Sequence, residues 1–465
     1  MSPPNTPPRS LVDGIVQRLA RQIDDGLLQP DARLRSIREA AAEEGVSRNT
    51  VVEAYDRLVA LGYLIARRGS GYFVGRARRL AVSETPPHVA EAVDAMSLLR
   101  EQLEQHYEVR VGDGRLPASW MEGSELGKHL RGARLASEGA DQYEYGSPWG
   151  FHPLRERIAL FLNERSIHVA TRQVLLTHGA NHSLDLIVRH LLTPGDTVLV
   201  DSPGYYPLFA KLRLAKVQMI GVRRRPDGPD IEDLENMAAS TGAKVFFTQS
   251  LAHNPTGGSI SLPGAHRVLQ IATRHGLIVV EDDAFADLLP ASMTRLATLD
   301  QLDRVIYVGS FSKTLSASLR VGYVAAAAPV AQALCDLKMV TVASSSAYVE
   351  RLVHQLIIGG QYRRHLKRLH ARLETMAAEA RRALLALGLR IEPSPSSGFF
   401  CWAELPAHLD ERSLARRASA EGIFLAPGYV FMPYPETSIR ALRINVAYAT
   451  NPRFVAFMRE ALRSA

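Results

Sequence analysis

Apolar residues near the start of the chain recur at the spacing of one helix face. They lie four residues apart, at Leu11, Ile15, Leu19 and Ile23. This spacing predicts an amphipathic helix that ends near Gly26, where the pattern breaks.

Two further helices are marked by their capping residues. Ser36, followed three residues later by Glu39, has the pattern of a capping box, and Gly45 ends this segment. Ser47 then caps a third helix over residues 48–61, in which apolar positions again recur at helical spacing. The sequence therefore predicts three short helices in succession.

A basic hairpin follows the third helix. Apolar runs at 63–66 and 72–74 flank the turn RRGSG at 67–71, which predicts two short strands around a glycine-containing turn. Three helices followed by such a hairpin are typical of a winged helix-turn-helix, whose third helix enters the major groove of DNA. A small helical interaction domain would give a similar pattern and stays open as an alternative.

The rest of the chain alternates between strand-like and helical patterns. The apolar strand-like runs lie at residues 174–177, 197–201, 244–248, 277–281, 305–309 and 321–325. This alternation predicts an α/β fold with a mostly parallel sheet sandwiched by helices. A long basic helix over 362–387 then leads to a smaller C-terminal α+β subdomain.

These patterns divide the chain into three parts. We expect a DNA-binding domain over residues 9–75, a linker over 76–110 and an α/β domain over 111–465. The linker is proposed because basic residues and the run TPP at 85–87 interrupt the apolar periodicity.

Composition excludes several classes of protein. Of the 465 residues, 46% are apolar and 22% are charged, which is typical of globular domains and not of disordered or collagen-like chains. No uninterrupted apolar run reaches the ~18 to 20 residues of a membrane span. The start, MSPPNTPPRS, lacks the apolar core of an export signal, so we expect a cytoplasmic protein. Cys335 and Cys401 lack the spacing of a zinc site, and no metal is predicted.

Charge is unevenly distributed. The net charge is +7, and residues 1–80 hold 13 arginines against 9 acidic residues. The basic excess therefore concentrates at the N-terminus, which is where polyanion binding is expected.

Candidate chemistry lies after the predicted strands of the large domain. Lys313 follows a strand, at the carboxyl end where α/β sheets bind ligands. The run GAN at 179–181 opens a helix and can offer N–H groups to an anion, while HNPTG at 253–257 adds an amide and EDD at 281–283 adds carboxylates. An amine, a carboxylate, an amide and anion donors together are what pyridoxal phosphate requires.

On these motifs, residues 111–465 resemble a fold type I, class I aminotransferase domain, and residues 11–74 resemble the GntR-family winged helix. The whole chain resembles the MocR/GabR-type transcriptional regulators. The resemblance implies that pyridoxal 5'-phosphate is the cofactor.

The resemblance also assigns roles around the cofactor. Lys313 would form the Schiff base, Asp282 would pair with the pyridinium nitrogen, Asn254 would bond the ring hydroxyl, and Tyr205 would stack on the ring. The phosphate would be held by Gly179, Ala180, Ser310 and Arg320.

Three further positions complete this comparison. Tyr145 resembles the tyrosine that reaches the phosphate of the neighbouring subunit, which implies a homodimer. Arg443, in LRINVA, resembles the arginine that binds the substrate carboxylate, and a surface ion pair is its alternative role. Phe285 stands where related enzymes carry a tyrosine that bonds the ring oxygen, so one hydrogen bond worth ~1 kcal/mol is expected to be missing.

In the N-terminal domain the resemblance implies contacts to double-stranded operator DNA. The contacting side chains would be those of Arg38, Arg48, Asn49, Arg67 and Arg68. The sequence thus favours a regulator that senses pyridoxal phosphate, an amino acid or an amine. The alternatives are an active aminotransferase with an appended DNA-binding head, and a vestigial domain that only dimerises.

Overall fold

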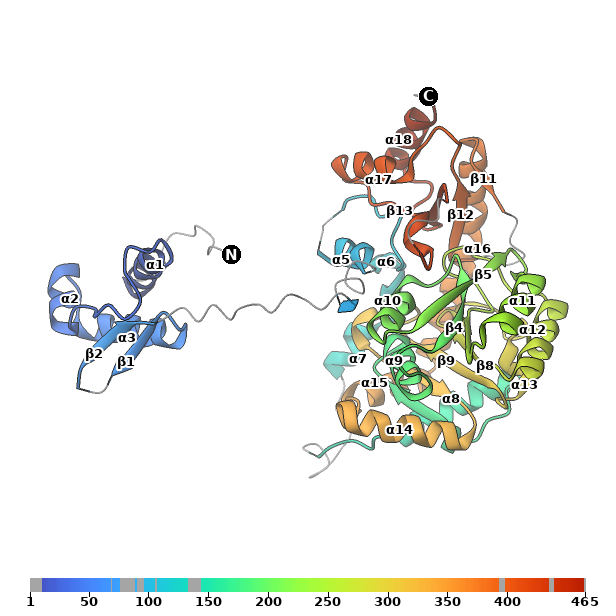
Figure 1. The fold of residues 1–465 in the computed structure, drawn as a ribbon, viewed down its shortest axis with the longest axis horizontal. Helices are drawn as coiled ribbons and strands as arrows, with labels where there is room; N and C mark the ends of the chain where they lie inside the picture. Colours follow the sequence, from blue (N-terminus) through green and yellow to red (C-terminus); the bar gives the residue numbers. More distant parts are fainter. Residues whose placement is uncertain are drawn as a thin grey trace. The chain divides into compact units, whose positions relative to one another are not determined.

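The computed structural model describes residues 11–67, 69–75, 88–89, 96–104, 107–132, 144–392, 398–434 and 439–463. The chain divides into two compact units, Met1–Thr85 and Pro86–Ala465 (Figure 1).

The N-terminal unit consists of three helices and a hairpin. These are α1 (Leu11–Asp24), α2 (Ile37–Glu44), α3 (Arg48–Ala60), β1 (Leu64–Arg67) and β2 (Gly71–Val74). The predicted capping box is confirmed, because Ser36 and Glu39 exchange hydrogen bonds at the start of α2. Gly45 ends that helix with a φ of +65°, a conformation that favours glycine. Val51 and Leu58 on α3 are completely buried at the centre of this small core.

The C-terminal unit is built on a mixed sheet, in the order β3-β10-β9-β8-β7-β4-β5-β6. Its strands are β3 (Val174–Thr177), β4 (Thr197–Ser202), β5 (Gln218–Arg225), β6 (Gly228–Pro229), β7 (Val245–Thr248), β8 (Ile278–Asp283), β9 (Val305–Ser310) and β10 (Gly322–Ala325). The run from β9 through β8, β7 and β4 to β5 is parallel, as the alternation of patterns predicts. Strand β5 was not among the predicted strands.

Helices cover both faces of this sheet. One face packs against α8 (His152–Glu164), α11 (Ile231–Thr241), α12 (Leu262–His275), α13 (Leu296–Asp300) and α15 (Ala347–Ile358). The other face packs against α9 (Ala180–Leu191), α10 (Tyr206–Leu214) and α14 (Ala328–Val342). Neighbouring residues of one strand, such as Phe246 and Phe247, belong to opposite layers because side chains alternate along a strand.

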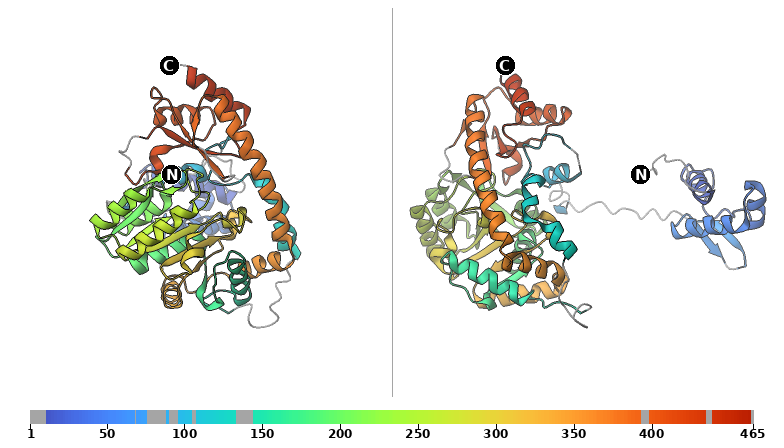
Figure 2. Two further views of the ribbon diagram at one scale, coloured as in Figure 1. Left: turned by 90° about the vertical axis from the view of Figure 1, so that its right-hand side faces the viewer. Right: turned by 180° about the vertical axis from the view of Figure 1, so that it is seen from behind.

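A smaller subdomain is formed by the end of the chain. It has an antiparallel sheet in the order β11-β12-β14-β13, with β11 (Arg390–Ile391), β12 (Phe400–Glu404), β13 (Ala426–Pro427) and β14 (Ala441–Asn445), covered by α17 (Glu411–Ala420) and α18 (Pro452–Arg463). The long helix α16 (Gln361–Ala386) runs from the large sheet to this subdomain (Figure 2). Before the large sheet lie α5 (Ser97–Glu104), α6 (Ala118–Met121) and α7 (Leu126–Gly132).

Strand β10 departs from the parallel arrangement because it is antiparallel to both of its neighbours. Gly322, its first residue, lies opposite Ser310 at the end of β9 and opposite Thr177 at the end of β3. The loop between β9 and β10 therefore leaves and re-enters the sheet at the same edge. Among the described residues, no helix has the length and apolar character needed to cross a membrane.

Candidate functional site

The predicted site residues of the large domain gather where strands end. Gly179 follows β3, Asn254 lies beyond β7, Asp282 is near the end of β8, and Ser310 ends β9. Because the carboxyl ends of parallel strands meet at one edge of a sheet, these positions share one ligand-binding edge.

Asp282 has one carboxylate oxygen available to a ligand. Its Oδ2 accepts a hydrogen bond of 2.9 Å from Nε2 of Gln249, whereas its Oδ1 is buried and has no partner among the described residues. Burial raises the pKa of Asp282 to about 6, although the bond from Gln249 acts in the opposite direction. A buried acceptor without a donor is costly, so this oxygen suits an N–H group of a bound ligand.

Lys313 lies in the loop after β9, and its amine is held by the backbone. The Nζ donates a hydrogen bond of 2.6 Å to the carbonyl oxygen of Gly114. Burial lowers the pKa of Lys313 to about 8, and the nearby Asp113 carboxylate only partly offsets this. A larger share of the amine is therefore neutral, and nucleophilic, than in an ordinary lysine.

An anion-binding corner forms around the start of α9. The guanidinium of Arg320 donates a hydrogen bond of 3.0 Å to the carbonyl of His178, and a side chain at Gly179 would come within 2.9 Å of that guanidinium. A side chain at Gly322 would come within 2.7 Å of the Cα of Gly179. The two glycines thus allow backbone N–H groups, the helix start and a cation to converge, as an anion requires. Ser310 lies at this edge, and its Oγ accepts a 3.1 Å hydrogen bond from the N–H of Ser312.

Arg443, on β14, is a buried cation whose hydrogen bonds go to neutral acceptors. Its side chain donates to Oδ1 of Asn254 at 2.9 Å and to the carbonyl of Gly112 at 2.7 Å. The rings of Phe400 and Phe431 lie 4.6 and 4.7 Å from its guanidinium carbon. No carboxylate of the described residues forms an ion pair with it, and its Nε is buried without a partner. Burial lowers its pKa to about 10, and the residue is only 2% exposed, so it does not form the surface ion pair considered as an alternative.

The remaining aromatic positions differ in their surroundings. Tyr205 and Asp282 line the same small cavity, and burial, together with the Asp282 carboxylate, raises the pKa of Tyr205. Phe285 is buried against Phe399, at a ring distance of 5.2 Å. Tyr145 is 88% exposed and is therefore not packed into the site of its own chain.

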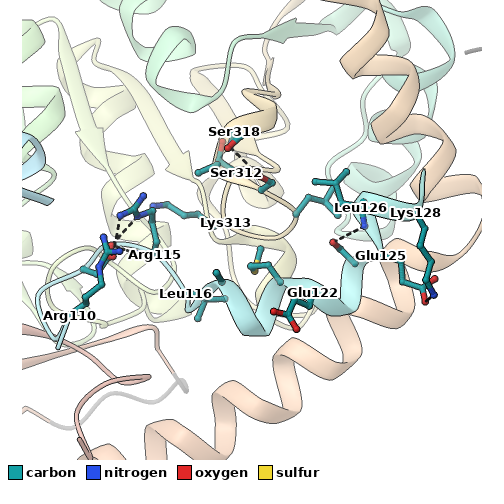
Figure 3. Close-up of a pocket in the computed structure, with 18 of the residues that line it drawn as sticks. Arg110, Arg115, Leu116, Glu122, Glu125, Leu126, Lys128, Ser312, Lys313 and Ser318 are labelled. Atoms are coloured by element: carbon teal, nitrogen blue, oxygen red, sulfur yellow. Dashed lines mark hydrogen bonds and ion pairs between the residues drawn. The ribbon is translucent and has the colours of Figure 1, made fainter. Parts of the chain in front are cut away.

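A cavity of about 590 Å³ opens beside Lys313. In Figure 3, Lys313 and Arg115 lie at one end of this cavity, and Leu126 and Lys128 lie towards the other. Asp113 pairs with Arg115 at 3.2 Å, and the wall between the ends includes Ser312. The primary amine of Lys313 is thus reached from an open space lined by both polar and apolar side chains.

Sequence reasoning missed two parts of this site. Gln249, directly after β7, bonds both Asp282 and the backbone N–H of Asn254, the latter at 2.7 Å. Its position after a strand end could have identified it. The carbonyls of Gly112 and Gly114, by contrast, carry no signal in the local sequence.

The predicted DNA-contacting residues of the small unit are exposed where described. Arg38 lies on α2, and Arg48 and Asn49 begin α3. Among the described residues, Arg38 and Arg48 form no ion pair. Arg67 pairs with Asp31 at 3.3 Å. Arg68 lies outside the described residues.

The donors and acceptors around Lys313 fit pyridoxal phosphate. The unpartnered Oδ1 of Asp282 suits a protonated ring nitrogen, and the corner at Gly179 suits a phosphate. These features stand on the same sheet edge as the amine of Lys313.

Comparison with known proteins agrees with both units. The family described as aminotransferase class I and II matches residues 112–455, and the family described as bacterial regulatory proteins, gntR family, matches residues 11–74. An uncharacterized HTH-type transcriptional regulator, YdfD of Bacillus subtilis (strain 168), is 26% identical over 453 residues, which cover 94% of this chain and 92% of that protein. The 2-aminoadipate transaminase of Thermus thermophilus is 31% identical over 329 residues, which cover 68% and 80%.

A solved structure agrees as well. LysN, the alpha-aminoadipate aminotransferase of Thermus thermophilus, complexed with N-(5'-phosphopyridoxyl)-L-leucine, has a TM-score of 0.70 and 27% identity, and the match covers 80% of this chain and 96% of that chain. The predicted fold class, family and cofactor class are thereby confirmed, because aminotransferases of this fold depend on pyridoxal phosphate. The chain belongs to the aminotransferase class I and II family and, with its GntR-type head, has the architecture of the MocR/GabR-type transcriptional regulators.

Proposed function

We propose that this protein is a DNA-binding transcriptional regulator that holds pyridoxal phosphate at Lys313 and senses an amino acid or amine there. The observation that carries the proposal is Arg443, a buried guanidinium with no carboxylate partner among the described residues. Arg443 bonds Asn254, which lies at the sheet edge that bears Lys313. It therefore provides a carboxylate site beside the cofactor site.

The cofactor is held by residues of several strand ends. When bound, pyridoxal phosphate supplies an aldehyde carbon that condenses with primary amines. Lys313 provides the amine that attaches it, Oδ1 of Asp282 accepts the ring N–H, Asn254 bonds the ring oxygen, and Tyr205 covers the ring. The phosphate is bound by the groups of the anion-binding corner, Gly179, Ala180, Ser310 and Arg320.

Arg443 binds the carboxylate of the effector. Guanidinium presents a planar fork that matches a carboxylate, and a charged hydrogen bond contributes about 1.5 to 3 kcal/mol. Its present acceptors, Asn254 and the Gly112 carbonyl, are neutral, so an incoming carboxylate is the stronger partner. An amine effector without a carboxylate would not use this site.

A second copy of the chain completes the phosphate site. The loop that carries Tyr145 packs next to the start of α15, which follows α14 closely, because a side chain at Gly146 would meet Ala347 at 3.4 Å. Exposed apolar side chains gather along this region, with Val340 81% and Met339 54% exposed. Such a patch is typical of an interface, and a homodimer would let Tyr145 reach the partner's phosphate.

The GntR-type unit binds DNA. Arg48 and Asn49 begin α3, where the recognition helix of a winged helix-turn-helix contacts base edges, and Arg38 on α2 and Arg67 on the hairpin suit phosphate contacts. Arg68 has the same proposed role. The cytoplasm is the compartment that this function requires.

An active transaminase with an appended head is the second candidate. It is favoured by the presence of Lys313, Asp282, Asn254 and Arg443, and by the similarity to a transaminase. The two candidates differ in whether effector binding changes the affinity for DNA. Such a change requires that two conformational states of the protein bind the effector with different affinities.

The test is selection of genomic DNA fragments by the purified, cofactor-loaded protein, with Lys313→Ala and Arg48→Ala as comparisons. Enrichment of a short repeated site that Arg48→Ala abolishes supports the regulator. Salt-sensitive binding without sequence preference, combined with turnover of amino donors, would favour the transaminase.

A further inference from the structure

The side-chain amide of Gln249 connects Asp282 with Asn254, which belong to separate sequence motifs. Its Nε2 donates to Oδ2 of Asp282 at 2.9 Å, and its Oε1 accepts from the backbone N–H of Asn254 at 2.7 Å. Asn254 in turn accepts a hydrogen bond from Arg443 at 2.9 Å. A continuous chain of hydrogen bonds therefore runs from Arg443 to Asp282.

The backbone of Gln249 is itself fixed by a buried ion pair. Its N–H donates to Oδ2 of Asp201 at 3.2 Å, and its carbonyl accepts from Nη2 of Arg224 at 2.8 Å. Asp201 and Arg224 pair with each other at 3.1 Å, with side chains 4% and 0% exposed. The side chain of Gln249 is therefore presented from a rigid base, which is what precise orientation of a neighbour requires.

We propose that Gln249 is a positioning residue, which aims the free oxygen of Asp282 at the cofactor's ring nitrogen and couples Asp282 to the carboxylate site at Arg443. The inference rests on the proposed function, because it concerns the same cofactor site and effector. It assigns Gln249 no direct contact with either ligand.

The amide acts on Asp282 in two ways. By donating to Oδ2 it leaves Oδ1 as the oxygen that can accept from a ligand, and it fixes the plane of the carboxyl group. It also lowers the pKa of Asp282 against the larger effect of burial, so the carboxyl group is ionised at lower pH than burial alone would allow. An ionised Asp282 is the form that accepts the ring N–H.

The coupling to Arg443 runs through Asn254. A carboxylate that binds Arg443 competes for the guanidinium hydrogen that Oδ1 of Asn254 accepts. The backbone N–H of Asn254 is bonded to Oε1 of Gln249, so a shift of Asn254 on effector binding reaches the amide that bonds Asp282. Effector binding and the electrostatics of the ring nitrogen are thus linked.

Other ionisable groups also surround Asp282. Those that affect its pKa or lie beside it are Asp283, Lys313, Tyr205, His253 and Asp201. Substitution of Gln249 leaves all of these groups in place, so a shift in pH dependence in a variant that adds no charge reports on the amide.

Two substitutions separate the functions of the amide. Gln249→Glu keeps the shape and the acceptor for Asn254 but replaces the donor to Asp282 by a second carboxyl group. Gln249→Met keeps the length and removes both bonds. Gln218→Glu and Gln218→Met, at an exposed position on β5, are the matched controls.

The measurements use the full chain, first without and then with pyridoxal phosphate. They are the dissociation constant for the cofactor, the pH midpoint of the bound cofactor's absorbance change, and borohydride trapping at Lys313. In both Gln249 variants we expect affinity to fall about tenfold, and the midpoint to rise by about one unit because Asp282 ionises less readily. Trapping at Lys313 should persist, and the Gln218 variants should match wild type.

A midpoint that is unchanged or lower in Gln249→Met would overturn the proposal, even if affinity falls, because loss of packing alone would admit water and lower the pKa of Asp282. If Gln249→Met fails to fold, Gln249→Leu decides, since it also removes both bonds without adding a charge. Failure of the wild-type protein to take up the cofactor would instead overturn the proposed function, a result seen before any variant is compared.

Discussion

Lys313 and Arg443 donate hydrogen bonds to the same short backbone segment. The amine reaches the carbonyl of Gly114 at 2.6 Å, and the guanidinium reaches that of Gly112 at 2.7 Å. The amide of Asn445 holds this segment as well, through the carbonyl of Asp113 at 2.9 Å. Both cations thus donate to neutral backbone carbonyls, which are weaker partners than the cofactor or a carboxylate that would replace them.

Replacing Lys313 by Ala should abolish covalent attachment of the cofactor. Borohydride reduction followed by mass spectrometry should detect the added pyridoxyl group on wild type and not on the variant. Lys128→Ala, an exposed lysine at the far side of the cavity, is the control. Trapping at another lysine in Lys313→Ala would contradict the assignment.

The rate at which the cofactor attaches to Lys313 should depend on pH, with a midpoint near the pKa of Lys313. Its pKa is lowered to about 8, chiefly by burial, so the neutral amine grows about tenfold per pH unit below 8 and levels off above it. Stopped-flow absorbance of the cofactor-free protein mixed with pyridoxal phosphate measures this. A rate still rising steeply above pH 9 would indicate an ordinary lysine with a pKa of ~10.4.

Arg443→Gln should weaken binding of effectors that carry a carboxylate. Loss of about 1.5 to 3 kcal/mol corresponds to a roughly ten- to hundredfold weaker response. Titration of amino acids against the absorbance of the bound cofactor provides the measurement, and the corresponding decarboxylated amines should respond equally in both proteins. The exposed Arg440→Gln serves as the control, and equal amino-acid affinities for Arg443→Gln and wild type would refute the carboxylate site.

Arg48→Ala should weaken specific DNA binding by about 1 to 3 kcal/mol if it contacts a base, without affecting the bound cofactor. Arg57, on the same helix, is paired with Asp13 at 2.8 Å, and Arg57→Ala therefore removes an equal charge away from the helix start. Fluorescence anisotropy with the selected operator compares the two. Identical losses in both variants would indicate a general charge effect.

Val340→Glu should dissociate the dimer, because it places a charge on a side chain that is 81% exposed in the single chain. Loss of the dimer should also weaken cofactor binding by removing Tyr145 of the partner subunit. Sedimentation velocity gives the oligomeric state, with Leu385→Glu on α16 as an equally polar control. A variant that remains dimeric would place the interface elsewhere.

Features encoded by neighbouring residues were predictable from the sequence. The capping box at Ser36 and the helix end at Gly45 depend on contacts within a few positions, and both are present in the structure. The parallel strands other than β5 were predictable because buried strands are short apolar runs, whereas β5 ends in three arginines. The direction of β10 was not, since it is decided by how the loop after β9 returns to the sheet.

Long-range partners were beyond prediction from sequence. The carbonyl that holds Arg443 belongs to Gly112, far away along the chain and on a segment without any distinctive motif. Gln249 reads as one more polar residue after a strand until its two hydrogen bonds are seen. Phe285 was interpreted only as a missing hydroxyl, whereas its ring also packs against Phe399.

The return of β10 to the edge where β9 ends makes the length of the intervening loop a constraint in its own right. Lys313 and Arg320 lie in this loop, whose two ends are fixed by the pairing of Ser310 with Gly322. One inserted residue would either slip β10, turning each of its buried side chains to the opposite face, or change the separation of amine and guanidinium. Sequence change in this segment should therefore be tolerated by substitution far more readily than by insertion or deletion.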